Sequence, residues 1–251
     1  DRRQRQMCIR DRYKPRFSNS WDEYRNSIWH RVGYVNWGYE AIGRFDSWEQ
    51  IANYPVDNDR KGNRTVVPGD IMYKDQNNDG VINYLDERPI GYRVDSTPTL
   101  NFGINLSASW KGFDLAMDWT GSGMTSWNQC YETARPFQND GNSPDEVLKD
   151  AWHLSDIWDA NSPLIPGKYP MVRLNTDETS AYDKSSYWLH NVTYLKLRNL
   201  EVGYTFPKTW LNRTGISNLR LFVSGTNLLT LSNLSVMDPE CASDNGLDYP
   251  P

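Results

Sequence analysis

The clearest chemical pattern in this chain lies in residues 74–86, which follow the spacing D-x-[DN]-x-[DN]-G-x-I. This is the spacing of a loop that wraps calcium with oxygen ligands, and Gly80 stands where such a loop turns sharply. The oxygen donors at positions 1, 3, 5, 7 and 12 of the loop are supplied by Asp75, Asn77, Asp79, the carbonyl of Val81, and Asp86.

Two interpretations of this segment stay open. Asp86 replaces the longer glutamate that normally binds calcium through both oxygens, so a calcium site here is expected to be weak. No helix-forming sequence precedes the loop. The alternative is an Asx-rich turn, in which the same side chains satisfy the backbone of the loop itself. No cofactor is required on either interpretation, and calcium is the one candidate.

Nothing else in the sequence indicates catalysis. The three histidines are His30, His153 and His190, and none stands beside a serine or cysteine in a nucleophile motif. Carboxylates are plentiful, but no spacing singles out an acid and base pair. The sequence therefore predicts that the protein is not an enzyme.

Two runs of alternating apolar and polar residues, 100–110 and 113–121, are joined at Lys111 and Gly112. Strict alternation over this length predicts two strands of a hairpin, each with one apolar face. At about 3.3 Å per residue and a tilt near 45°, eleven residues cover about 25 Å, the height of the apolar band of an outer-membrane barrel. The polar face, assigned to a barrel lumen, carries Asn101, Asn105, Asp114 and Asp118. A soluble hairpin with that face in solvent is the alternative.

Composition narrows the class of protein. No apolar stretch approaches the roughly 20 residues of a membrane helix, and the mean hydropathy is −0.75. Residues 1–12 are interpreted as translated sequencing adapter, because residues 7–11 are what the codons ATG TGT ATA AGA GAC encode; a basic arm is the alternative. Without that segment, five Arg and two Asp leave and the net charge moves from −5 to −8. So acidic a chain argues against nucleic acid as a partner.

The remaining chain, 13–251, is predicted to carry four strands, at about 99–110, 113–121, 190–206 and 218–230. In the third, the apolar positions change parity near Arg198 and Asn199, which indicates a bulge or an exit from the apolar zone. Short helices are expected at 47–53 and at 143–152, the second capped by Ser143. Short turns alternate with long connections at 45–98, 122–190 and after 231, an asymmetry typical of outer-membrane barrels.

Several blocks, in this order, resemble the C-terminal part of the SusC/RagA family of TonB-linked outer-membrane transporters. They span about residues 30–250, and their order and spacing carry the resemblance. The blocks are Gly38-Tyr-Glu-Ala-Ile-Gly-Arg-Phe45, Pro68-Gly-Asp-Ile-Met-Tyr-Lys-Asp-Gln-Asn-Asn-Asp-Gly-Val-Ile-Asn83, Arg88-Pro-Ile-Gly91, Leu106-Ser-Ala-Ser-Trp-Lys-Gly-Phe-Asp114, Lys168-Tyr-Pro170, Tyr194-Leu-Lys-Leu-Arg-Asn-Leu200, Gly203-Tyr-Thr-Phe-Pro207 and Ser224-Gly-Thr-Asn-Leu-Leu-Thr230.

The resemblance implies an all-β fold: a partial antiparallel transmembrane β-barrel, made of C-terminal strands of a 22-stranded barrel, with long extracellular loops. It also implies an outer-membrane location and the import of glycan, sometimes peptide, cargo. The implied partners are a SusD-like surface lipoprotein that acts as a lid, the TonB complex and outer-membrane lipid. The plug, the TonB box and the last strand of the family pattern are expected to lie outside this fragment.

A function of another class is kept beside this one. A secreted carbohydrate-binding or carbohydrate-active β-protein could use the eleven tryptophans as sugar platforms and the calcium-like loop as a staple. Such a protein needs a second apolar sheet to cover the apolar face of the hairpin, and the sequence supplies few candidates for it.

Overall fold

The computed structural model describes residues 20–26, 35–92, 98–138, 141–174, 179–212, 215–234 and 237–240. The chain divides into two units, residues 1–34 and 35–251. In the first unit the structure describes one helix, α2 (Ser20–Asn26). The segment 1–12 and His30 lie outside the described residues, so the interpretation of 1–12 as adapter stays a prediction.

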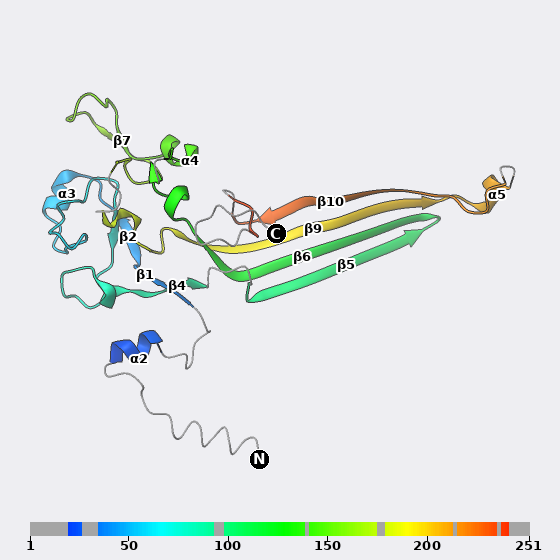
Figure 1. Ribbon diagram of the computed structural model, residues 1–251, viewed down its shortest axis with the longest axis horizontal. Helices are drawn as coiled ribbons and strands as arrows, with labels where there is room; N and C mark the ends of the chain where they lie inside the picture. The colour runs from blue at the N-terminus through cyan, green and yellow to red at the C-terminus, as the bar shows by residue number, and fades with distance from the viewer. Residues whose placement is uncertain are drawn as a thin grey trace, which may run out of the picture. The chain divides into compact units, whose positions relative to one another are not determined.

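Four long strands of the second unit form one antiparallel sheet in the order β10-β9-β6-β5 (Figure 1). Each begins and ends close to the predicted range, except that β6 is longer at its C-terminal end. The strands are β5 (Leu100–Trp110), β6 (Phe113–Asn128), β9 (Leu189–Thr205) and β10 (Arg220–Ser232). The all-β, antiparallel fold class predicted from the sequence is confirmed.

The turn between β5 and β6 consists of Lys111 and Gly112, with φ of 47° and 91°. Two successive residues with positive φ make the tight hairpin turn whose twist matches that of the strands. At position 112 glycine is needed for a second reason, because a Cβ there would lie 2.7 Å from the backbone oxygen of Thr205. The alternation that predicted the hairpin and its turn is therefore confirmed residue by residue, with Trp110 paired to Phe113.

The parity change in β9 is a bulge. Asp118 pairs with Asn199 and Trp119 pairs with Leu197, so Arg198 is the extra residue on the β9 side. The register between β9 and β10 shifts at the same place. An extra residue reverses which face the following side chains point to, which accounts for the change of parity in the sequence.

Strand β6 runs seven residues past the predicted end at 121, and this is a correction to the sequence analysis. Residues 122–128 read Ser-Gly-Met-Thr-Ser-Trp-Asn and show no alternation of apolar and polar side chains. Alternation is required only where one face is apolar and the other polar. Most of this segment is buried, Trp127 being 1% exposed, because the long connections pack around it.

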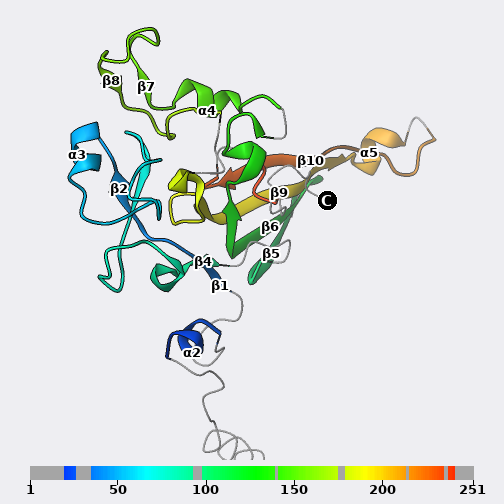
Figure 2. The ribbon, with the colours of Figure 1, turned by 60° about the vertical axis from the view of Figure 1, so that its left-hand side comes forward.

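The long connections fold into short elements around one end of the sheet, where the C-terminal end of β6 pairs with the N-terminal end of β9 (Figure 2). Strand β1 (Val35–Gly38) pairs with β4 (Arg88–Tyr92), β2 (Ala41–Arg44) with β3 (Ile71–Tyr73), and β7 (His153–Leu154) with β8 (Leu164–Ile165). The helices there are α3 (Trp48–Ala52) and α4 (Asp145–Lys149), with the 3₁₀ turns η1 (Tyr84–Asp86), η2 (Tyr131–Thr133) and η4 (Ser180–Tyr182). Helix α5 (Lys208–Leu211) lies at the opposite end of the sheet, in the turn between β9 and β10 (Figure 1).

Both helices predicted in the connections form. Ser47 caps α3 by accepting a hydrogen bond from the backbone N–H of Gln50. Helix α4 is shorter than the predicted 143–152, and its N-cap position is Pro144, with no side-chain cap, rather than Ser143. The helix ends early because Asp150 and Trp152 bond instead to Tyr169, whose N–H donates to the Asp150 carbonyl and whose carbonyl accepts from Trp152.

In the described residues, the clusters of the hydrophobic core lie among these connections rather than on the sheet. The largest cluster of buried apolar residues joins segment 35–92 to segment 129–188. Aromatic rings dominate it, with Tyr73 and Tyr169 almost fully buried and Trp188 2% exposed. The full cluster is Tyr39, Ile71, Tyr73, Ile82, Ala134, Val147, Ala151, Tyr169, Ala181, Tyr182 and Trp188. The two connections therefore fold as one body.

Candidate functional site

The loop predicted as a calcium site brings three carboxylates together. One oxygen from each of Asp75, Asp79 and Asp86 lies within 4.8 Å of the other two. Asp86 is fully buried and Asp79 is exposed. Asn77 lies beside them, and its side-chain amide donates to Asp79 Oδ2 over 2.9 Å. The carbonyl of Val81 accepts a hydrogen bond from Asn83 Nδ2 at 3.2 Å.

Backbone amides hold this arrangement. Gly80 adopts φ 83° and Asn78 adopts φ 59°, so the loop turns through two left-handed residues. Asp75 accepts from the N–H of Asn78 and of Gly80, at 2.6 and 2.8 Å. Asp79 accepts from the N–H of Val81 and the amide of Asn77, and these bonds lower the pKa of the Asp79 carboxyl. The Asx-rich turn described as the alternative is therefore present.

The same donors fit a calcium ion. Carboxylate oxygens are hard ligands of the kind Ca²⁺ prefers, and each carboxylate oxygen has about two lone-pair directions. Asp86 uses one direction on each oxygen, accepting from the N–H of Gln76 and of Asn83. The loop is also tied to the core, since Ile82 is fully buried and its N–H donates to the Asp57 carbonyl.

The sheet has one polar face, and all four residues assigned to it lie there. The register places Asn105 opposite Asp118, Asn101 opposite Ser122, and Asp114 opposite Ser109. Asp118 accepts a hydrogen bond from Asn199 on β9 at 3.2 Å.

Sequence reasoning missed the cations on this face. Arg220 on β10 bonds to Asp114 on β6 and, at 2.5 Å, to Glu201 on β9, so one guanidinium joins three strands. Lys196 and Arg198 lie further along β9. The sequence did contain a signal for these ion pairs. Basic residues occupy polar positions of the third and fourth predicted strands, and aspartates occupy the polar positions of the second.

A segment that follows β10 is held against this polar face. Lys196, only 5% exposed, donates to Asp238 at 2.9 and 3.0 Å and to Glu240 at 2.8 Å. Glu240 also bonds to Arg198, the residue of the bulge. We call residues 237–240 the inner strap. A buried lysine requires carboxylate partners, so the strap is bound where β9 changes register.

The opposite face of the sheet is apolar on all four strands. One row across it contains Trp110, Phe113, Tyr204 and Leu221, and the next contains Ala108, Leu115, Val202 and Val223. Leu100, Phe102, Ile104, Leu106 and Val223 are all more than 40% exposed. Within the described ranges, the four sheets share no strand and no second sheet covers this face.

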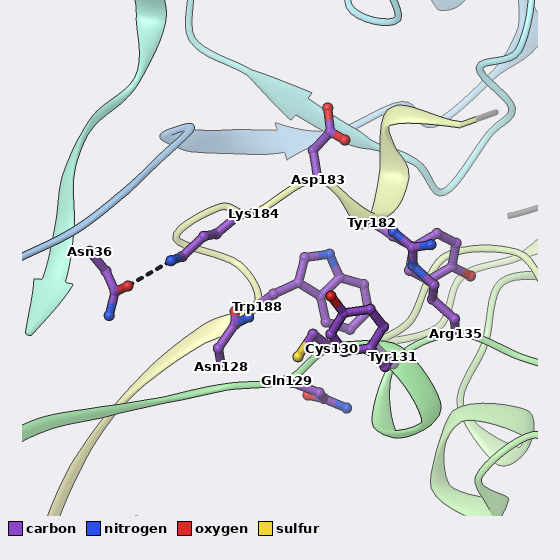
Figure 3. Close-up of a pocket in the computed structure, with 11 residues that line it drawn as sticks. Asn36, Asn128, Gln129, Cys130, Tyr131, Arg135, Tyr182, Asp183, Lys184 and Trp188 are labelled. Atoms are coloured by element: carbon purple, nitrogen blue, oxygen red, sulfur yellow. Dashed lines mark hydrogen bonds between the residues drawn. The ribbon is translucent and has the colours of Figure 1, made fainter. Parts of the chain in front are cut away.

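A pocket of about 470 Å³ opens among the connections near the end of β6 (Figure 3). Its volume lies in the range of small-molecule sites. Trp188 lies at its centre in this view, and the amide of Asn36 accepts a hydrogen bond from Lys184 at 2.6 Å. Tyr131 has φ 46°, an uncommon conformation for a bulky residue, and its ring is half exposed. Aromatic rings, amides and charges together suit a polar ligand. None of these residues was singled out from the sequence.

Two ion pairs join the two connections, and one of them includes Asp183 in the lining of the pocket. Arg60 pairs with Asp183, and Arg173 pairs with the fully buried Asp70. Burial raises the pKa of both carboxyl groups above the ordinary value, and the guanidinium beside each works in the opposite direction. Burial also raises the pKa of the Tyr182 phenol to about 12.

A single sheet with one apolar and one polar face, long folded connections at one end and short turns at the other is the architecture of a membrane barrel wall. No family model matches the chain. Curated proteins from Formosa agariphila match it in sequence. TonB-dependent receptor P3 is 30% identical over 84% of this chain and 21% of its own length, and TonB-dependent receptor P26 is 27% identical over 81% and 19%. The chain thus spans about a fifth of these relatives.

Solved structures agree on the fold. The structure of the RagAB peptide transporter matches with a TM-score of 0.50 and 20% identity, covering 82% of this chain and 20% of that chain. The RagAB peptide importer in the "open-open" state matches with a TM-score of 0.52 and 22% identity, covering 86% and 21%. The chain is therefore SusC/RagA-like in its fold, and in sequence it matches a part of TonB-dependent receptors. Its relatives are named as receptors, not as enzymes.

None of the described helices is long and apolar enough to cross a membrane.

Proposed function

We propose that this chain forms part of the wall and outer rim of an outer-membrane transporter that imports glycans or other oligomeric nutrients. The observation that carries the proposal is the four-stranded sheet with opposite faces of opposite polarity. An apolar face of Leu, Phe, Val and Trp side chains suits lipid, and a face crossed by ion pairs suits a water-filled lumen. The match to TonB-dependent receptors supports the same conclusion.

The proposal extends to the energy source and the partner. Transport is driven through the TonB complex by parts of the protein outside this fragment, and a SusD-like surface lipoprotein covers the rim. We call segments 35–92 and 129–188, which share the core cluster, the rim connections. They belong on the extracellular side, because barrels of this class have short turns on the periplasmic side and long loops outside. The pocket near Trp188 and Tyr131 offers aromatic and amide groups to a cargo there.

The secreted carbohydrate protein receives less support. A soluble protein with this sheet must bury its apolar face against another apolar surface. In the described residues the core lies among the rim connections, and side chains such as Phe102 and Val223 stay exposed.

The test is the behaviour of the full-length gene product. We expect it to fractionate with the outer membrane and to migrate faster on a gel before boiling than after it, since a folded barrel resists detergent. Recovery of the intact protein as a soluble secreted species would refute the proposal. Uptake by cells with and without the gene, compared for labelled oligosaccharides and labelled peptides, decides the cargo class.

We also propose that loop 75–86 binds calcium weakly, in the range of about 10⁻⁴ to 10⁻³ M known for extracellular modules. Asp86 and Asp79 are the residues to change. Terbium bound to the full-length protein should give a luminescence signal that falls when calcium displaces the terbium. Asp79→Asn and Asp86→Asn should each reduce the luminescence of the terbium-loaded protein. Asp145→Asn, which removes an exposed carboxylate on α4, is the matched control.

A further inference from the structure

The hairpin formed by β7 and β8, residues 153–165, presents two large apolar side chains to solvent. Trp158 is 90% exposed and Ile157 is 74% exposed. Trp158 has the highest exposure among the large apolar side chains that the structure describes. Both stand in a loop of the rim connections, so the lipid that explains the exposed side chains of the four-stranded sheet does not explain these.

The loop that carries these side chains is internally braced. We call residues 156–159 the hairpin tip. Asp156 Oδ1 accepts from the N–H of Trp158 at 2.9 Å, and Asp159 Oδ1 accepts from the N–H of Asn161 at 2.9 Å. The Ser162 hydroxyl donates a hydrogen bond to the Asp156 carbonyl and accepts one from the backbone N–H of Asp156. The segment contains no glycine and its backbone is pinned on both sides, so Trp158 is presented with little conformational entropy left to lose on binding.

Charge selects the kind of surface that can cover the tip. Asp156 and Asp159 flank the two apolar residues directly. Between residues 145 and 165 the chain carries five carboxylates and one lysine, and that lysine, Lys149, is paired with Asp145. An anionic surface such as the phosphate-bearing lipopolysaccharide layer is repelled by this distribution. A protein surface with an apolar pocket ringed by Lys or Arg complements it.

We propose that the hairpin tip is a docking anchor for a folded protein outside the outer membrane, with Trp158 and Ile157 seated in an apolar pocket that basic side chains surround. This inference rests on the proposed function, in which a surface lipoprotein covers the rim, and it assigns that lipoprotein a contact on this chain. Tryptophan, like tyrosine and arginine, is enriched among the few residues that carry most of the binding energy of an interface.

The experiment uses the full-length transporter purified with the surface lipoprotein encoded beside its gene. Trp158→Ala is expected to weaken the affinity of the pair about 10- to 100-fold, the usual loss at a central anchor. Trp48→Ala is the matched control, because Trp48 is a 57% exposed tryptophan on α3 and is expected to change nothing. Asp156→Asn with Asp159→Asn keeps both backbone hydrogen bonds and removes the charges, and it should abolish most of the dependence of affinity on salt.

The outcomes separate the inference from the proposed function. If the wild-type proteins bind and Trp158→Ala binds equally well, the docking anchor is refuted while the proposed function stands. If the wild-type proteins do not bind, both fail. If Trp158→Ala instead lowers the yield of heat-modifiable barrel, the tip packs against the same chain and the anchor is refuted. Trp158-dependent binding to lipopolysaccharide vesicles, with unchanged lipoprotein affinity, refutes it as well.

Discussion

The ion pairs of the inner strap predict how much stability the protein loses when Lys196 is replaced. Lys196 is held by Asp238 and Glu240, and its side chain is 6% exposed. Lys196→Met removes the cation and leaves Glu240, whose side chain is 12% exposed, with Arg198 as its remaining cationic partner. Hydrogen bonds to charged groups contribute about 1.5–3 kcal/mol each, and Asp238 is the more exposed partner, so we expect a loss of about 2–4 kcal/mol.

A double-mutant cycle separates the ion pair from general packing. Glu240→Gln keeps the shape of the side chain and removes its charge. We expect Lys196→Met with Glu240→Gln to lose clearly less stability than the sum of the two single variants, because neither charge is then left buried without its partner.

The assay is the unfolding of the full-length protein in detergent, followed by the loss of heat-modifiable migration as urea or temperature rises. A second readout is limited proteolysis after residue 232, where a released strap should be cut faster. If the two single losses simply add, or if Lys196→Met unfolds with the wild-type protein and resists the protease equally, the ion pairs do not hold the strap and the reasoning is wrong.

Three further predictions concern the turn, the pH dependence and the metal. Gly112→Val should slow barrel assembly and destabilise the barrel by about 1–3 kcal/mol, because a Cβ at this position meets the Thr205 carbonyl and the backbone has φ of 91°. The yield of heat-modifiable barrel measures the effect, and Lys111→Asn is the control that should be tolerated. Asp59 is buried, which raises its pKa, but hydrogen bonds from Thr65, Lys61 and Asn63 outweigh this and lower it from 3.8 to about 2. The stability it contributes, at most about 2 kcal/mol, is therefore present above pH 3.8 and lost as the pH falls towards 2, and Asp59→Asn should remove that acid-dependent part in pH-dependent unfolding. Chelation of calcium should speed proteolysis within residues 75–86, and Asp86→Asn should abolish the difference between calcium and chelator.

The sheet could be predicted because the alternation of apolar and polar side chains can be read within each strand, without knowing which strands pair. A sheet with one apolar and one polar face needs an apolar side chain at every second position, so residues 100–110 and 113–121 carry the pattern in plain order. The bulge at Arg198 was readable for the same reason, because an extra residue shifts the pattern by one. Prediction failed at residue 122, where the strand enters the packed rim and its side chains are buried on both faces.

The rim could not be predicted in this way. Its core gathers Tyr39, Tyr73, Tyr169 and Trp188 from two connections with no periodic spacing. Its ion pairs are equally distant in sequence, with Arg173 bonded to Asp70 across 103 positions. The gathering of Asp75, Asp79 and Asp86 was the exception, because these carboxylates come from one short stretch with a fixed order.

The shared core of the two rim connections constrains how such proteins can be altered. Segment 35–92 contributes Ile71 and Tyr73, and segment 129–188 contributes Tyr169 and Trp188, to one packed cluster. Exchanging either connection alone with that of a relative would therefore break the cluster and leave Asp70 buried without Arg173. The two connections must be inherited, or grafted, as a pair, so the modular unit of this rim is the pair of loops together with the strand ends that carry them.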